Sequence, residues 1–329
     1  MVKQGLTVFI TFLLILLLTG AEMSEEQKDL EAERQARRRL LASRPRPELK
    51  REPDKELVYK KTAQGELKIY IYFPEDWKES DRRPGIVFFH GGGFTGGSPK
   101  QFFSKGEYLA SRGLVAFSAQ YRLKKAHGTT PVEAAEDARS AMRYVRGHAA
   151  QFGIDPERII SGGGSAGGHL AACVALCEGP DAKDDDLSIS CKPQAMVLFN
   201  PVFELGIARR LERLFGSDEE KISLVKQISP MEYLEGECPP AILFYGTEDR
   251  VLPEGRRFVE KSLALGNKAE LWTAEGEPHA FFNASPWHEA TTIKADEFLT
   301  SLGYLTGPPT LKPYDEKAVL KKELPLKGD

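Results

Sequence analysis

Cysteine is scarce in this sequence, and its few cysteines do not form a metal-binding pattern. Only four occur among 329 residues, and no two of them have the C-x-x-C spacing of a zinc or redox motif. A metal site is therefore not predicted. Cys177 and Cys191 could close a short disulfide loop, whereas Cys173 and Cys177, one helical turn apart, could equally be buried free thiols. The sequence leaves this choice, and the pairing of Cys238, open.

An excess of charge of one sign is also missing, and so are internal repeats. Lys and Arg total 45 against 48 for Asp and Glu, a net charge of −3. This balance gives no basic footprint for a nucleic-acid partner. With 41% hydrophobic residues the chain can bury a full core, and its length suits one α/β domain with extensions.

One long apolar run is present, at the N-terminus. Lys3 gives a cationic start, Val8 to Leu18 are almost all apolar, and residues 19–21 (Thr-Gly-Ala) are small. This pattern predicts an export signal over residues 1–21, cleaved near Ala21. The alternative is an uncleaved membrane anchor, because the uncharged run approaches spanning length. Either alternative predicts an exported protein, periplasmic or extracellular, that contacts a membrane only if the signal is uncleaved.

The rest of the chain divides by composition. Residues 22–56 are dominated by charge and are interrupted by prolines near their end, which predicts a charged helix or linker. Residues 57–305 are predicted to form one folded domain. Residues 306–329 are predicted to be a polar, loosely attached C-terminal tail.

Within the predicted domain, apolar strand patterns alternate with helical ones. Alternation at residues 67–73 predicts a strand, and continuous apolar runs predict further buried strands at 85–90, 114–118, 158–161, 195–199, 241–245 and 270–273. Helical spacing predicts helices over 131–152, 253–265 and 289–302. Because strands alternate with helices, we predict an α/β fold with a doubly wound, mostly parallel sheet.

The strongest functional pattern is IISGGGSAGGHLA at residues 159–171. Gly163 to Gly167 match G-x-S-x-G, in which a serine lies on a sharp turn between a strand and a helix. Such a turn lifts the serine Oγ off the sheet edge, and the helix N-terminus directs N–H groups at an oxyanion. The motif alone would also suit a plain glycine-rich turn, but the flanking strand and helix patterns favour Ser165 as a nucleophile.

A second glycine-rich stretch can supply oxyanion donors. His90-Gly91-Gly92-Gly93-Phe94 directly follows the predicted strand at 85–90, and an HGGG-type loop in that place forms half of an oxyanion hole. The predicted donors are the N–H groups of Gly92, Gly93 and Ala166. A phosphate-binding turn is disfavoured because no G-x-G-x-x-G helix follows. His90 itself is expected to brace the loop.

The base and its orienting acid are predicted after two later strands, at the same sheet edge. Among six histidines, His279 in the stretch GEPHAFF is the predicted base. His169 is expected to point into the helix after the serine, and His288 to lie at the surface. Asp249 in GTEDRVLP is the predicted acid, with Glu248 as a rival that the sequence separates poorly.

These segments together resemble a known family. HGGGF, GGGSAGGHLA, GTEDRVLP and EPHAFF, in this order, are similar to the hormone-sensitive-lipase-like and acetyl-esterase branch of the α/β-hydrolase superfamily. The resemblance covers about residues 57–305 and implies an eight-stranded sheet, no cofactor and hydrolysis of small carboxylic esters. It implies the same roles for the residues already selected: Ser165, Asp249, His279, Gly92, Gly93 and Ala166.

Two departures from that family concern the substrate. Gly164 stands where many lipase-like members have an acidic residue, and the segment ahead of the sheet is short and charged instead of a longer helical cap. The insertion at 203–237 contains the amphipathic stretch IARRLERLF at 207–215, which we expect to cover the site partly.

The sequence therefore predicts an exported serine carboxylesterase for short, acetyl-like esters, with acetylated carbohydrate as a candidate substrate. Two alternatives stay open. One is another hydrolase on the same scaffold, such as a peptidase or an arylformamidase. The other is a non-catalytic binding protein of hydrolase fold, which a complete set of catalytic residues disfavours. The acyl length, the alcohol and the oligomeric state are not predicted.

Overall fold

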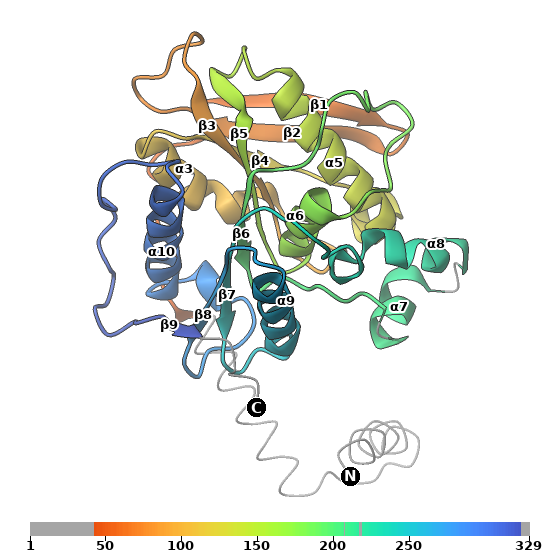
Figure 1. Cartoon of the computed structure of the whole chain (residues 1–329). Helices are drawn as coiled ribbons and strands as arrows, with labels where there is room; N and C mark the ends of the chain where they lie inside the picture. Colours follow the sequence, from red (N-terminus) through yellow and green to blue (C-terminus); the bar gives the residue numbers. More distant parts are fainter. Residues whose placement is uncertain (1–42, 207, 217–218, 324–329) are drawn as a thin grey trace, which may run out of the picture. The chain divides into compact units, whose positions relative to one another are not determined.

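A computed structural model describes residues 43–206, 208–216 and 219–323 of the chain (Figure 1). The chain divides into two compact units, Met1–Pro45 and Arg46–Asp329, and the second holds every element described below. The predicted export signal at 1–21 lies outside the described residues. Within the described ranges, no helix is both long and apolar enough to span a bilayer.

The second unit is built on one sheet, which has nine strands among the described residues. Their order is β1-β2-β4-β3-β5-β6-β7-β8-β9. The six central strands, β4, β3, β5, β6, β7 and β8, run parallel. At the edges, β1 and β2 on one side and β9 on the other pair antiparallel. The strands are β1 Lys55–Thr62, β2 Gly65–Tyr72, β3 Arg83–Phe89, β4 Val115–Ala119, β5 Ile154–Gly164, β6 Ala195–Phe199, β7 Ala241–Gly246, β8 Ala269–Ala274 and β9 Lys321–Glu323.

Helices cover both faces of this sheet, so the predicted doubly wound α/β fold is confirmed. In Figure 1, α3 and α10 lie on one side of the strands, and α5, α6 and α9 on the other. Their bounds are α3 Phe103–Ser111, α5 Pro131–Gly147, α6 Ala166–Leu176, α9 Leu252–Ala264 and α10 Trp287–Ser301. The shorter helices are α4 Lys124–His127, α7 Ala208–Phe215, α8 Glu219–Ser223, η1 Pro99–Phe102, η2 Leu224–Ile228, η3 Pro230–Glu232 and η4 Phe281–Asn283.

Strand β3 shows how the two faces are built. Val87 and Phe89 belong to the core cluster that packs under α5, α6 and α9, whereas Ile86 and Phe88 belong to the cluster under α3 and α10. Successive side chains of a strand point to opposite faces. A continuous apolar run therefore serves both layers at once, as expected for a parallel strand buried on two sides.

The edges of the sheet differ from the expectation. The resemblance implied eight strands, but the described residues form nine because the C-terminal segment adds β9 to the edge of β8, pairing Leu271 with Glu323. The tail predicted to be loosely attached is therefore tied to the sheet at this point. At the other end, β1 begins at Lys55 and the compact unit at Arg46, so the folded part begins earlier than residue 57.

One helix predicted from the sequence shows how local signals fix its start. Helix α5 begins at Pro131, and the Glu133 carboxylate accepts a hydrogen bond from the Thr130 N–H at 2.9 Å while the Thr130 hydroxyl accepts one from the Val132 N–H. This reciprocal arrangement is a capping box. The helix ends at Gly147 instead of the predicted residue 152, because the chain then turns toward β5.

Candidate active site

Ser165 lies at the junction of β5 and α6 in a strained backbone conformation. Its φ of 54° and ψ of −116° are costly for a residue that carries a Cβ. The Ser165 N–H donates to the Phe199 carbonyl at 2.9 Å, and its own carbonyl accepts from the His169 N–H at 3.0 Å. Sheet and helix together hold the turn and raise the side chain above the strand ends.

The three residues predicted as nucleophile, base and acid meet at this point. Ser165 Oγ lies 2.8 Å from Nε2 of His279, and Nδ1 of His279 lies 2.7 Å from Oδ2 of Asp249. The Asp249 side chain is 1% exposed and that of His279 39%. Asp249 Oδ1 accepts a further hydrogen bond from the Val251 N–H. Its rival Glu248 is exposed, so the structure brings Asp249 to the histidine.

The glycine loop after β3 turns back on itself beside Ser165. Gly92 has a φ of +127°, and a Cβ there would lie 2.0 Å from the Gly96 carbonyl oxygen, so only glycine fits. Among the described residues, the N–H groups of Gly92 and Gly93 donate no hydrogen bond. Ala166 is the first residue of α6, where an N–H has no partner within the helix. These donors are available to a ligand.

His90 braces this loop, as expected. Its Nδ1 lies 2.8 Å from the Gly91 carbonyl oxygen, and its ring stacks on Tyr121 with centroids 4.3 Å apart. The Tyr121 hydroxyl donates to the His90 carbonyl, and the next residue, Arg122, is held by the buried carboxylate of Asp137. Burial lowers the pKa of His90 to about 4, so the ring is neutral near pH 7.

Two other histidines line the core near the site. His169 is buried with Nδ1 2.7 Å from the Val202 carbonyl oxygen, which agrees with the predicted inward direction. His288 was predicted at the surface, and this prediction is wrong. It is 6% exposed, with Nε2 2.9 Å from Ser104 Oγ, because α10 packs against α3, a helix that the sequence pattern did not reveal. Burial lowers the pKa of His169 and of His288 to about 4, and the charge of Lys105 adds to the effect at His288.

Asn200 is a site residue that the sequence analysis did not select. It follows β6 with a φ of 37° and is fully buried. Its Nδ2 lies 3.3 Å from Nε2 of His279, and its Oδ1 accepts a hydrogen bond of 3.1 Å from the Ala280 N–H. One signal could have found it, since it directly follows a predicted strand whose carboxyl end lies at the same sheet edge as the other site residues.

The insertion after β6 approaches the glycine loop. Helix α7 corresponds to the predicted amphipathic stretch, and a Cβ at Gly93 would lie 3.1 Å from Nη1 of Arg213. The base of the insertion is anchored on the buried Glu254, which accepts a hydrogen bond from the Phe203 N–H at 2.8 Å and pairs with Arg210 at 2.7 Å. The insertion therefore lies beside the site as a partial cover.

Steric crowding explains why residue 164 is a glycine instead of the acidic residue that many lipase-like members have before the serine. A Cβ at this position would lie 2.5 Å from Cζ of Phe282. The Phe282 ring stacks on Phe199 with centroids 4.9 Å apart and is buried. Aromatic rings therefore fill the space beside residue 164, and an acidic side chain would not fit there.

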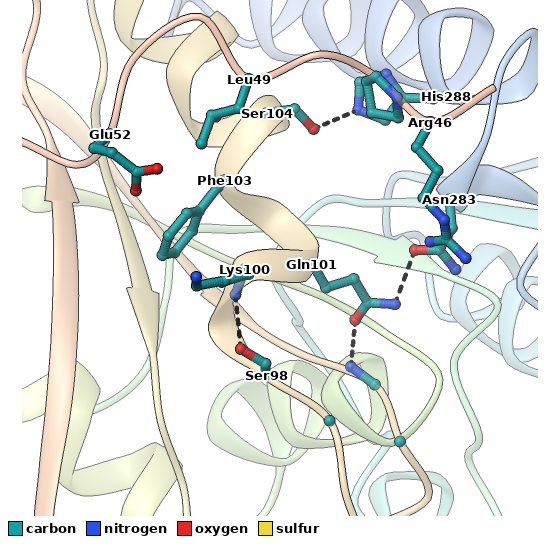
Figure 2. Close-up of a pocket in the computed structure, with 14 residues that line it drawn as sticks. Arg46, Leu49, Glu52, Ser98, Lys100, Gln101, Phe103, Ser104, Asn283 and His288 are labelled. Atoms are coloured by element: carbon teal, nitrogen blue, oxygen red, sulfur yellow. Dashed lines mark hydrogen bonds between the residues drawn. The ribbon is translucent and has the colours of Figure 1, made fainter.

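A pocket of about 540 Å³ opens beside the glycine loop (Figure 2). Polar side chains from η1, α3, η4 and α10 form much of its wall, and the N-terminal segment contributes Arg46 and Leu49. Gln101 accepts a hydrogen bond of 2.5 Å from the Gly91 N–H and donates one of 2.9 Å to Asn283 Oδ1. The pocket reaches Gly91 and Gly92 and so borders the place where an oxyanion would bind.

The cysteines take no part in this site. All four are free and buried. Cys177 and Cys191 therefore form no disulfide, and of the two alternatives left open by the sequence the structure has the free thiols. Within the described ranges, no group of three or more His, Cys, Asp or Glu side chains is placed to hold a metal ion.

The fold and the Ser-His-Asp contacts are those of an α/β-hydrolase, and comparison with known proteins agrees. The BD-FAE family matches residues 69–257. Esterase LipI of Mycobacterium tuberculosis is 34% identical over 258 residues, covering 72% of this chain and 78% of that protein. An esterase of the planctomycete Thermogutta terrifontis superposes with a TM-score of 0.72 at 41% identity, covering 80% of this chain and 96% of that one.

More distant relatives are longer than this chain. A probable isoprenylcysteine alpha-carbonyl methylesterase of Arabidopsis thaliana is 26% identical over 232 residues, covering 64% of this chain but 48% of that protein. The chain spans about half the length of such curated relatives. The chain belongs to the BD-FAE family, within the hormone-sensitive-lipase-like carboxylesterase branch of the α/β-hydrolases.

Proposed function

We propose that this protein is a serine carboxylesterase with Ser165 as nucleophile, His279 as base and Asp249 as orienting acid. The observation that carries the proposal is the pair of contacts at His279, 2.8 Å to Ser165 Oγ and 2.7 Å to Asp249. Support also comes from the Thermogutta terrifontis esterase, which has been solved phosphoramylated by tabun. Organophosphates of this kind react with an activated serine.

In the proposed reaction, Oγ of Ser165 attacks the ester carbonyl while Nε2 of His279 takes its proton. The imidazolium then gives this proton to the leaving alcohol, and water hydrolyses the acyl-enzyme by the same steps in reverse. Asp249 holds the Nδ1–H tautomer. The N–H groups of Gly92, Gly93 and Ala166 stabilise the oxyanion, and one such donor is worth about 3–4 kcal/mol in the transition state.

The proposed substrates are esters of short acyl groups with a polar alcohol. The Thermogutta terrifontis esterase has been solved with propionate bound and with butyrate bound, which favours short acyl chains. The pocket beside the glycine loop presents Gln101, Ser104 and Asn283, side chains that suit a hydroxyl-rich alcohol such as acetylated carbohydrate. Export, on the pattern of residues 1–21, is part of the proposal.

Measuring acetate release distinguishes a carbohydrate substrate from a small aryl ester. We expect the enzyme to release acetate from acetylated xylan at a rate within about tenfold of that on a small aryl acetate, because polar side chains form much of the pocket wall. The measurement is acetate produced per enzyme molecule on each substrate. Turnover of the aryl ester with none of the polymer would restrict the protein to small esters, and the α7 insertion would be the cause to examine.

The acid can be tested with two adjacent carboxylates. Asp249→Asn should lower kcat by about 10⁴-fold, because an amide at this position favours the wrong tautomer of His279. Glu248→Gln is the matched control, and its kcat should stay within about twofold of the parent value. Substitutions of exposed side chains usually have small effects. The measurement is kcat on an aryl acetate for both variants. A larger loss in Glu248→Gln would reassign the acid.

A further inference from the structure

The orientation of the Asn200 amide is fixed by its partners. Oδ1 lies 3.1 Å from the Ala280 nitrogen, and a backbone N–H can only donate. The oxygen must therefore face Ala280, because the reverse orientation would place the Asn200 NH₂ group against the Ala280 N–H, and both groups are donors. It follows that the NH₂ group faces Nε2 of His279, 3.3 Å away.

The same reasoning fixes two more amides that lead to the glycine loop. The Gln101 oxygen accepts from the Gly91 N–H, so its NH₂ group faces Asn283 Oδ1 at 2.9 Å (Figure 2). The Asn283 NH₂ group then donates to the Ala280 carbonyl at 2.9 Å. Ala280 is thus held from both sides, its carbonyl by Asn283 and its N–H by Asn200. These carboxamides connect the glycine loop with the segment that carries the catalytic histidine.

We propose that Asn200 is a positioning residue for His279, which holds the ring over Ser165 through its contact with Nε2. This proposal rests on the proposed function. Neutral Nε2 has a lone pair that can accept from an N–H, but protonated Nε2 presents a hydrogen to the Asn200 NH₂ group, and two donors repel. The amide contact is therefore made with the neutral ring, which is the form that takes the proton of Ser165 in the proposed reaction.

Three segments bring other groups close to His279. Asp249, from the loop after β7, is the carboxylate in direct contact, 2.7 Å from Nδ1. Ser165, from the β5–α6 turn, is neutral. On the histidine's own segment, Glu277 is buried, and its carbonyl oxygen accepts from the Glu248 N–H. Asn200 thus contacts Nε2 while Asp249 contacts Nδ1, so the two side chains hold the ring at both of its nitrogens.

The test uses the reaction of Ser165 with a fluorophosphonate, measured against pH, which needs no knowledge of the natural substrate. Asn200→Asp keeps the shape and tolerates the positive φ, but places a carboxylate at Nε2. We expect the midpoint of the acid limb to rise by about one pH unit or more. Asn200→Gly, which also suits the backbone, removes both contacts and should lower the plateau rate by about tenfold.

A matched control exists elsewhere in the chain. Asn267 also bridges two backbone groups, accepting from the Cys238 N–H and donating to the Gly236 carbonyl, and Asn267→Asp should leave the pH profile unchanged. Ser165→Ala must abolish labelling; if labelling persists, the proposed function fails and the acid limb belongs to another residue. If labelling does depend on Ser165, an unmoved midpoint in Asn200→Asp together with an unchanged plateau in Asn200→Gly overturns the role of Asn200.

Discussion

Replacing Ser165 by alanine should lower kcat on an aryl acetate by about 10⁵–10⁶-fold, by analogy with the deletion of other catalytic triads. Alanine keeps the small volume that the strained turn requires but removes the hydroxyl oxygen that lies 2.8 Å from Nε2 of His279. The residual rate would come from the oxyanion donors and substrate binding alone. The measurement is steady-state turnover with variant protein free of parent enzyme.

A second serine–histidine pair provides the comparison for this variant. Ser104 Oγ lies 2.9 Å from Nε2 of His288, but Nδ1 of this histidine is 3.8 Å from the nearest carboxylate oxygen of Glu289. Ser104→Ala should therefore keep kcat within about tenfold of the parent value, since this pair lacks the oriented acid that the mechanism needs. Near-normal turnover in Ser165→Ala would contradict the proposed mechanism. A large loss of kcat in Ser104→Ala with little loss in Ser165→Ala would identify Ser104 as the nucleophile.

Lowering the pH from 7 to 5 should reduce the free energy of unfolding by about 5.5 kcal/mol through the titration of three buried histidines. Three buried histidines, His90, His169 and His288, have pKa values of about 4 in the folded protein, against about 6.5 when unfolded. Because each folded value is the lower one, the unfolded chain takes up protons first. The stabilisation is complete above about pH 6.5 and is lost as the pH falls toward 4, at about 2 kcal/mol per histidine by pH 5.

The measurement for this prediction is urea unfolding at pH 7 and at pH 5. His169→Asn is the informative variant, because an amide NH₂ can replace Nδ1–H as the donor to the Val202 carbonyl but does not titrate. The variant should lose about a third less stability between the two pH values than the parent does. Equal losses in parent and variant would show that His169 does not contribute.

The meeting of the three proposed catalytic residues could be predicted because each follows its own strand. Ser165, Asp249 and His279 lie in short motifs at strand ends, and the topology of a parallel sheet brings such ends together. Asn200 follows a strand as well, which is its one signal, but a single asparagine belongs to no motif that would distinguish it from other polar residues after strands. Its position depends on its positive φ and on the approach of Ala280, which are properties of the folded chain.

The burial of His288 and the presence of strand β9 could not be predicted, because both depend on contacts made in the folded chain. His288 was placed at the surface because helix α3, which covers it, has the sequence FSKGEYLAS, where polar residues and a glycine hide the helical period. Strand β9 has the sequence KKE, which has no apolar alternation at all. It forms because the edge of β8 offers unpaired backbone groups, and no property of these three residues alone would reveal that.

Strand β9 also changes what one edge of the sheet presents to other molecules. A bare edge strand such as β8 would be a template on which another chain could extend the sheet, the first step of edge-to-edge aggregation. With β9 in place, the outermost strand at this edge spans Lys321–Glu323 among the described residues and is charged throughout, and short, charged edges resist further pairing. We therefore expect the C-terminal segment to protect this edge of the sheet from pairing with another molecule.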